Sequence, residues 1–398
     1  MMTEERNYLC YLAGCGARKE TAQPPDFAVD WSMFLKEAAA LRLDSFVKYA
    51  IMKSPGLGCP EDTVSAIRGE LLKKAAGRML SAKKLQNLQE TWRSMGIESA
   101  VMKGQAIASA YGVPELRSGC DIDLYVDEKD EKKVYRWAEE QGHKVNRRIP
   151  GFMHGEIIHK ELGMIELHVA CCGPDEQVVR GKLAGEYLLV KPERPFVTVQ
   201  ECGAGITTLD MTEHMMFIVT HMINHYLHGE ATPRMILDVS AFFTAYRDQM
   251  DLAWLWKAME AQRYDRFLQT VFGIGICRFG FRTLPEMRAN CDSRDVDSLL
   301  DDFCSTGEDH EEIMAVYDAY CNGVMSSGIS SLPVRLKILL HNAAVAVHLM
   351  RTIGVKEVIR MGKGRVVRML RGDRKPADKA APGVEERLEM VRRLGLME

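Results

Sequence analysis

The residues best suited to chemistry are Asp121 and Asp123, which flank Ile122 at the start of an apolar run that ends at Val126. Because successive side chains of a strand alternate between its two faces, both carboxylates are expected on one face, about 6–7 Å apart. Two like charges this close are unfavourable unless a cation lies between them, and carboxylate oxygens suit Mg²⁺ or Mn²⁺. The pattern therefore predicts a divalent-cation site of the kind that accompanies a nucleoside triphosphate.

A third carboxylate is needed to complete a two-metal arrangement, and Glu166 is the candidate. It lies in the segment from Gly163 to Val169, where apolar residues alternate with Glu166 and His168. This alternation predicts a second strand with one acidic face. His168 shares that face, either as a group that supports the ligands or contacts the acceptor, or as a packed core histidine.

A phosphate-binding turn is predicted at Lys103-Gly104, between a short strand near Ile97 and a helix expected from Gln105. A strand that runs through glycine into a helix presents free backbone N–H groups and the positive end of the helix dipole. Lys103 adds a positive charge at this turn. Arg117 and Ser118 could supply a guanidinium fork and a hydroxyl to the same phosphate tail.

The order of these motifs, Lys-Gly, then Leu-Arg-Ser-x-x-Asp-Ile-Asp-Leu, then Ile-Glu-Leu-His, resembles the nucleotidyltransferase-fold proteins related to polymerase beta. It resembles more narrowly an uncharacterised bacterial branch with a Lys-Gly turn followed by Arg-x-x-x-Asp-x-Asp. The resemblance extends from about residue 30 to about residue 281. Further positions that match this branch are His221, His225, Arg234, Asp238 and the segment Asp251 to Trp254.

The resemblance implies roles for these residues. Asp121 and Asp123 would be metal ligands, with Glu166 as the third catalytic carboxylate. Lys103, Gly104, Arg117 and Ser118 would handle the triphosphate. The wider superfamily has Gly-Ser at the turn where this chain has Lys103-Gly104, so its phosphate contacts would differ in detail.

Composition is that of a soluble globular protein of two or three domains: 398 residues, 46% hydrophobic, 27% charged and a net charge of −3. The small net charge argues against a surface generally coated by nucleic acid. Eleven cysteines without Cys-x-x-Cys spacing favour reduced thiols in a cytoplasm. No apolar run reaches the roughly 20 residues that span a bilayer, and no secretory signal is expected.

Periodicity predicts a core of strands and helices between two helical parts, and the resemblance implies an α+β protein whose core is a nucleotidyltransferase-type mixed sheet. The expected divisions are a helical region at 1–95, a catalytic core at 96–210 and a helical domain at 211–371. A flexible linker and a terminal helix would follow at 372–398. Helical spacing is expected from Trp31 to Met95 and from Asp127 to Gln141, and strands at 143–147, 156–160, 188–190 and 195–199.

Four histidines, His214, His221, His225 and His228, have spacings that place them near one face of a helix that begins after Asp210. Three interpretations stay open. His221 and His225 could bind zinc with Asp238, they could contact the nucleotide or acceptor across the cleft, or the stripe could simply pack on the core. The resemblance favours the second for His221 and His225.

The segment 351–375 carries nine Lys or Arg residues and two acidic ones. It could be a solvated helix face or a surface that follows the phosphates of an RNA acceptor; it lacks aromatic residues for base stacking.

Together the motifs predict a metal-dependent transferase that moves a nucleoside monophosphate from a triphosphate such as ATP to a hydroxyl, with release of pyrophosphate. Small molecules, protein side chains and RNA ends are all compatible acceptors. Two alternatives are a nucleotide- or RNA-binding protein of the same fold with weak catalysis, and a zinc site on the histidine-rich helix.

Overall fold

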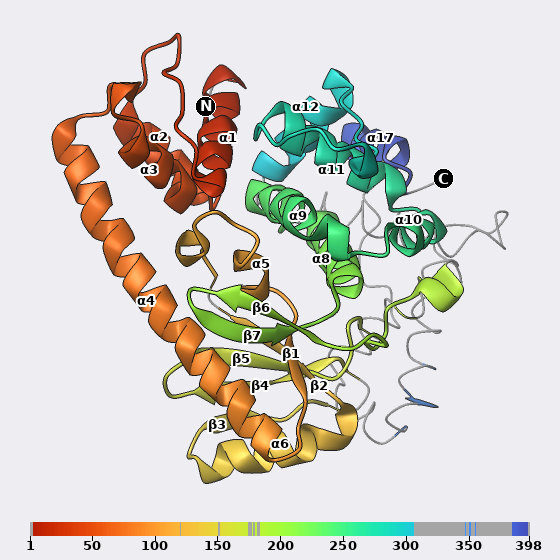
Figure 1. The fold of residues 1–398 in the computed structure, drawn as a ribbon. Helices are drawn as coiled ribbons and strands as arrows, with labels where there is room; N and C mark the ends of the chain where they lie inside the picture. Colours follow the sequence, from red (N-terminus) through yellow and green to blue (C-terminus); the bar gives the residue numbers. More distant parts are fainter. Residues whose placement is uncertain are drawn as a thin grey trace, which may run out of the picture.

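The computed structural model describes residues 3–119, 121–149, 152–173, 177, 180, 184–305, 347, 350, 351, 355 and 384–396. Within these residues, seven strands form one mixed sheet in the order β3-β4-β5-β2-β1-β7-β6 (Figure 1). β2 pairs in parallel with β5 and β1 in parallel with β7, whereas the other neighbours are antiparallel. Helices precede and follow the sheet, which confirms the predicted α+β class.

The strands follow the alternation of apolar and polar residues. Their bounds are β1 (Ser99–Val101), β2 (Ile122–Val126), β3 (Lys144–Asn146), β4 (His154–His159), β5 (Gly163–His168), β6 (Val197–Glu201) and β7 (Ala204–Thr208). β7 was not predicted, and residues 188–190 do not form the expected strand. The Cys202-Gly203 turn joins β6 to β7 as a hairpin, with positive φ at both residues.

The N-terminal helices are α1 (Thr3–Arg18), α2 (Trp31–Ala40), α3 (Asp44–Lys53) and α4 (Glu61–Ser94). α1 lies in the helical region expected at 1–95, ahead of the helical spacing that begins at Trp31. It packs on α3 and touches Phe279, whose carbonyl a Cβ at Gly14 would overlap. The Asp30 side chain caps α2 by accepting hydrogen bonds from the backbone N–H groups of Ser32 and Met33. The first helices are thus tied both to each other and to the C-terminal helices.

The 34-residue helix α4 runs from the N-terminal helices along the sheet (Figure 1). Near the end of α4, the buried Gln89 side-chain amide is hydrogen-bonded to the backbones of β1 and β7. It accepts from the Thr207 N–H at 3.0 Å and donates to the carbonyls of Thr207 and Ser99 at 2.9 and 3.3 Å. These bonds satisfy backbone groups that would otherwise be buried without partners.

Helix α6 (Glu128–Glu140) is capped by Asp127, in agreement with the predicted amphipathic helix, and buries Val134. The C-terminal helices gather at the end of the sheet opposite α6 (Figure 1). They are α8 (Met211–Leu227), α9 (Pro233–Tyr246), α10 (Leu252–Ala261), α11 (Asp265–Cys277), α12 (Ser293–Cys304) and α17 (Val384–Arg393).

Asp210 followed three residues later by Glu213 is the spacing of a capping box, but the start of α8 differs from that motif in one detail. Asp210 does accept from the Thr212 N–H at 2.9 Å. Glu213, however, accepts from the backbone N–H groups of Glu193 and Arg194 at 2.8 and 3.1 Å. Glu213 therefore fastens the loop before β6 to α8, where a reciprocal capping box would have closed on the helix itself.

The basic segment 351–375 and the linker expected from residue 372 lie outside the described residues, apart from residues 351 and 355. Among the helices that the structure describes, not one has the length and apolar character needed to cross a membrane.

His214 joins α8 to the sheet and makes folding sensitive to pH. Its buried ring is hydrogen-bonded to Thr208 at 3.0 Å, and burial lowers its pKa from 6.5 to about 3. The unfolded chain takes up this proton below pH 6.5 while the folded chain does not, so stability present above that pH is lost as pH falls. From pH 7.5 to 5.5 the expected loss is about 1.4 kcal/mol.

The measurement is urea denaturation of the wild type and of His214→Gln at both pH values. Because the other histidines contribute equally to both proteins, their difference isolates His214. Parallel pH dependence of the two unfolding free energies would contradict the assignment.

Candidate active site

The carboxylates of Asp123 and Glu166 meet on one face of the sheet. Asp123 on β2 is the register partner of Glu166 on β5, and the pairing is parallel. His168 follows on the same face of β5, and its Nε2 lies 3.1 Å from Asp123 Oδ1 and 3.2 Å from Glu166 Oε2. One imidazole thus bridges both carboxylates, as the shared face of Glu166 and His168 allows.

Lys103 supplies a second positive donor, because its Nζ lies 2.9 Å from Asp123 Oδ1. Burial works to raise the pKa of the Asp123 carboxyl, but the His168 hydrogen bond and the Lys103 charge outweigh it and hold the pKa well below its usual range. Burial works to lower the pKa of His168, and its bonds to Asp123 and Glu166 raise it above its usual range. The site is therefore built to hold positive charge against two carboxylates.

The position of Asp123 corrects one expectation. Two carboxylates at the start of a strand, where the sequence has Asp121 and Asp123, are expected to be exposed, but the Asp123 side chain is 2% exposed and partly supports the fold. Asp121 is partly buried and lies just before β2, which begins at Ile122. Glu166 is 22% exposed, so it is the member of the bridged pair that solvent reaches.

Helix α8 reaches this site through His221. Lys103 Nζ lies 3.4 Å from His221 Nε2, and burial, together with Lys103 and His225, holds the pKa of His221 well below its usual range. A neutral His221 can accept a hydrogen bond from the Lys103 ammonium. His225 packs against His221 with ring centroids 4.4 Å apart and is bonded to Glu230 at 3.0 Å.

Asp238 does not join His221 and His225 in a zinc site. It accepts from Arg117 Nε at 2.7 Å and Nη2 at 2.8 Å, from Tyr111 at 2.6 Å and from Arg234 at 3.2 Å. Burial works to raise the pKa of the Asp238 carboxyl, but the charges of Arg117 and Arg234 outweigh it and lower the pKa. The Asp238 carboxylate is thus fully occupied.

Arg117 links this buried pair to the Lys-Gly turn, since its Nη1 donates to the Gly104 carbonyl at 3.0 Å. Its side chain is 4% exposed, and its fork is bound to Asp238. In this arrangement Arg117 positions the turn. Gly104 itself has φ +57°, and the helix after it, α5 (Gln105–Ala108), is only four residues long where the sequence predicts one up to residue 111.

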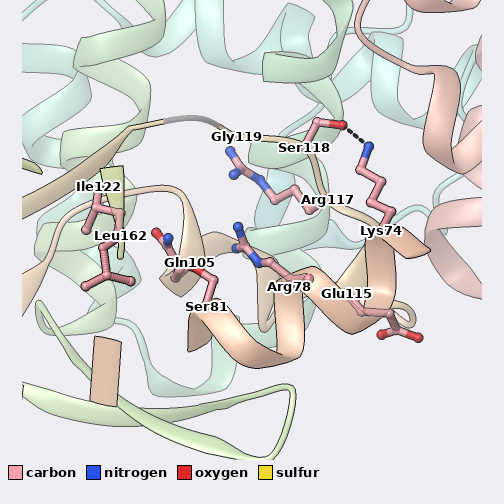
Figure 2. A pocket seen from close by; sticks show the side chains of 11 residues that line it. Lys74, Arg78, Ser81, Gln105, Glu115, Arg117, Ser118, Gly119, Ile122 and Leu162 are labelled. Atoms are coloured by element: carbon pink, nitrogen blue, oxygen red, sulfur yellow. Dashed lines mark hydrogen bonds between the residues drawn. The ribbon is translucent and has the colours of Figure 1, made fainter. Parts of the chain in front are cut away.

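Ser118 points toward α4 (Figure 2), where its hydroxyl accepts from Lys74 Nζ at 2.6 Å. Lys74 also bonds Ser45, and burial lowers its pKa. A cavity of about 220 Å³ opens beside them, lined among others by Arg78 of α4 and by Ile122. Since Ile122 faces away from Asp123 in β2, this cationic cavity lies on the opposite side of the sheet from the bridged carboxylates.

A cluster that the sequence analysis missed includes His154 of β4. Antiparallel pairing places His154 directly opposite His168. Within the part of the chain that the structure describes, the single group of at least three potential metal ligands consists of His154, Glu166 and His168, with ligand atoms within 4.8 Å of one another. The available signal was that His154 and Glu156 lie two residues apart, but the strand expected at 156–160 began too late to include His154.

The model of a family described as "uncharacterised nucleotidyltransferase" matches residues 28–278, which is more than half of the 398 residues. The chain therefore belongs to this nucleotidyltransferase family. The match covers the N-terminal helices from before α2, the whole sheet, and α8 to α11.

No curated protein matches the chain. Two solved structures show weak similarity. "Structure of tRNA-processing enzyme complex 3" has 13% identity and a TM-score of 0.20, and the match covers 78% of this chain and all of that one. "tRNA-processing enzyme (apo form I)" has 12% identity and a TM-score of 0.19, with 79% and 97% covered. Scores this low carry no argument about the acceptor.

Proposed function

We propose that this protein transfers a nucleoside monophosphate from a nucleoside triphosphate to a hydroxyl acceptor and releases pyrophosphate. The observation that carries the proposal is the register pair of Asp123 and Glu166 on β2 and β5, bridged by His168 and contacted by Lys103. Paired carboxylates that hold protein cations in this way have the donor chemistry of a Mg²⁺ or Mn²⁺ site.

Asp121, Asp123 and Glu166 are the proposed metal ligands. Their donors are carboxylate oxygens, which fit the preference of Mg²⁺. Such a dication, when bound, neutralises phosphate charge and lowers the pKa of an acceptor hydroxyl. The dication would balance the negative charge of Asp123 that Lys103 and His168 otherwise balance. Lys103, which has a long flexible side chain beside Gly104, could then pair with the triphosphate.

The proposed transfer forms one bond to the α-phosphorus and breaks another. The acceptor oxygen forms a bond to the α-phosphorus while the bond from that phosphorus to the β-phosphate oxygen breaks, and pyrophosphate leaves. The hydroxyl proton passes to Glu166 or to water; Glu166 serves as ligand, as base or as both. His221 stays neutral beside Lys103 and orients its ammonium.

The test uses the full chain with triphosphates labelled at either the α- or the γ-phosphate, Mg²⁺ or Mn²⁺, and three acceptor pools: total RNA, proteins and small metabolites. Label from the α-phosphate is expected in one pool, with one pyrophosphate released per transfer, and EDTA should abolish it. Each of the four bases is tested in turn.

Transfer of label from the γ-phosphate would instead indicate a phosphotransferase. Nucleotide binding without transfer into any pool would contradict the proposal and favour a binding protein of the same fold.

A further inference from the structure

His154, His168 and Glu166 form a compact set of donors at the edge of the carboxylate face. We propose that these three residues bind a transition-metal dication of the Zn²⁺ class, at a site that shares Glu166 with the oxygen-only site proposed for Mg²⁺ but takes its other ligands from two histidines. The proposal stands on strand register, donor type and buried nitrogen atoms.

Strand register brings the donors together. His154 on β4 pairs with His168 on β5, and Glu166 lies two residues before His168 on the same face. The ring centroids of the two histidines are 4.9 Å apart, and one ligand atom from each of the three residues lies within 4.8 Å of the others. Ligands of tetrahedral zinc lie about 3.3 Å apart at bonds of 2.0–2.1 Å, so each atom needs to move inward by less than about 1 Å.

The imidazoles of His154 and His168 each have a buried nitrogen atom that is available to a metal ion. Nδ1 of His154 and Nδ1 of His168 are buried and have no hydrogen-bond partner among the described residues. Leaving such an atom buried without a partner costs free energy, which a metal bond would offset. His168 Nε2 contacts both Asp123 and Glu166. With a metal at Nδ1, Asp123 would keep this contact and fix the ring and its tautomer, as the outer partners of metal-bound histidines commonly do, and Glu166 would turn from Nε2 to the metal.

The donor types select the metal. Mg²⁺ is bound by oxygen atoms and retains waters, whereas imidazole nitrogen suits Zn²⁺ and its neighbours in the first transition series. Two histidines and one glutamate are also a ligand set of zinc sites that keep a position open for water or substrate.

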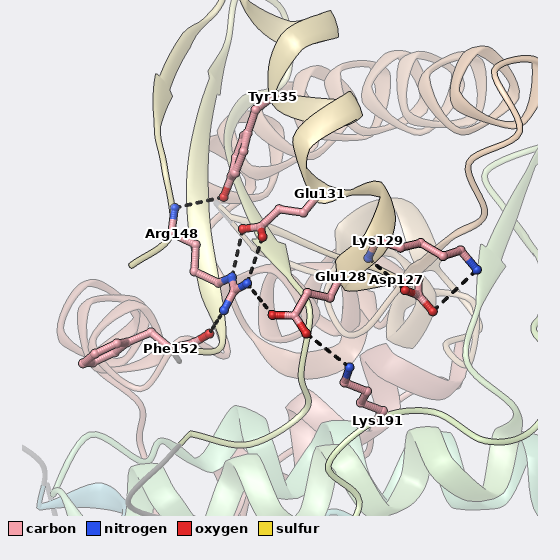
Figure 3. A network of polar contacts seen from close by, with 8 residues as sticks. All are labelled: Asp127, Glu128, Lys129, Glu131, Tyr135, Arg148, Phe152 and Lys191. Atoms are coloured by element: carbon pink, nitrogen blue, oxygen red, sulfur yellow. Dashed lines mark hydrogen bonds and ion pairs between the residues drawn. The ribbon is translucent and has the colours of Figure 1, made fainter. Parts of the chain in front are cut away.

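Arg148 and Phe152, which both precede β4 in the chain, are held against α6 by hydrogen bonds (Figure 3). The Arg148 guanidinium donates to both oxygens of Glu131 and to Glu128 at 2.8 Å, and to the Phe152 carbonyl at 2.8 Å. Phe152 lies two residues before His154. A ligand position supported by a buried bidentate pair is well ordered before metal arrives.

Because Glu166 belongs to both sites, Zn²⁺ is expected to compete with Mg²⁺ and to inhibit transfer. This consequence rests on the proposed function, whereas zinc binding itself does not.

The test is calorimetric titration of the metal-free full chain with Zn²⁺, together with Co²⁺ as a probe whose visible absorption reports nitrogen ligands. One Zn²⁺ per chain is expected. His154→Ala should weaken Zn²⁺ binding by about a hundredfold or more and remove the Co²⁺ bands. His159→Ala is the matched control, since His159 is on the same strand but the opposite face and contacts Trp137 and His143; its affinity should change less than about twofold.

Circular dichroism verifies that each variant is folded. If His154→Ala is not folded, His154→Gln replaces it in the titration. Lack of stoichiometric Zn²⁺ binding by the wild type, or unchanged affinity in the folded His154 variant, would overturn the proposal. Asp121→Asn separates the two sites: it should keep Zn²⁺ binding, because Asp121 is not in the cluster, while losing transfer. If the wild type binds zinc but transfers no nucleotide, the proposed function is wrong and the proposed zinc site stands.

Discussion

Asp123→Asn is expected to lower nucleotidyl transfer by about a thousandfold or more. The change removes a carboxylate charge that would hold the metal and, through it, the charge that develops on the phosphate in the transition state; such losses amount to several kcal/mol. Asp123 is also bonded to Lys103 and His168 in a buried position, so the variant should lose about 1.5–3 kcal/mol of unfolding free energy. Single-turnover transfer from α-labelled triphosphate and urea denaturation measure the two effects.

Asp121→Asn and Glu156→Gln separate chemistry from folding. Asp121 is partly buried and lies outside β2, so its replacement should abolish transfer to a similar extent while changing stability by less than about 0.5 kcal/mol. Glu156 on β4 is the register partner of Glu166 and shares its face, yet its carboxylate is engaged by Asn146 at 2.8 Å. Glu156→Gln should retain activity within about twofold. Full activity of Asp121→Asn, or equal loss in Glu156→Gln, would refute the assignment of the site.

Arg117→Met is expected to lower the free energy of unfolding by about 3–5 kcal/mol, because it leaves Asp238 buried with its bidentate partner removed. The same variant removes the hydrogen bond to the Gly104 carbonyl, which holds the Lys-Gly turn. The kcat for transfer is therefore expected to fall together with the free energy of unfolding. Replacing both partners, as in Arg117→Met with Asp238→Leu, should recover part of the stability, since no unpaired charge is left in the core. Urea denaturation of the three variants measures the effect.

A surface pair provides the control for Arg117. Arg147 Nη2 donates to both oxygens of Glu139 at 2.8 Å, but these side chains are 53% and 48% exposed. Arg147→Met should therefore cost less than about 1 kcal/mol. If Arg117→Met instead kept wild-type stability and raised only the KM for the triphosphate, Arg117 would be the phosphate ligand that the sequence predicts, and the positioning role would be wrong.

Local patterns in the sequence were enough to predict the parts that depend on neighbouring residues. The alternation around Asp123 and Glu166 predicts two strands with carboxylates on one face, and Asp127 marks the start of α6, because strand parity and helix caps are short-range properties. The order of motifs also predicts the nucleotidyltransferase family. By contrast, the hairpin of β6 and β7 was only half predicted, since Cys202-Gly203 is a weak turn signal beside such short strands.

Tertiary structure alone decided which partners each side chain has. Three facts depend on contacts between residues far apart in the chain: Arg117 binds Asp238, Ser118 turns toward Lys74, and Asp123 is buried. Spacing along the chain carries no information about strand register between non-adjacent segments or about which helix covers a face. The sequence by itself thus determined the kinds of groups in the candidate site and the strands that carry them. Packing determined which of them face one another.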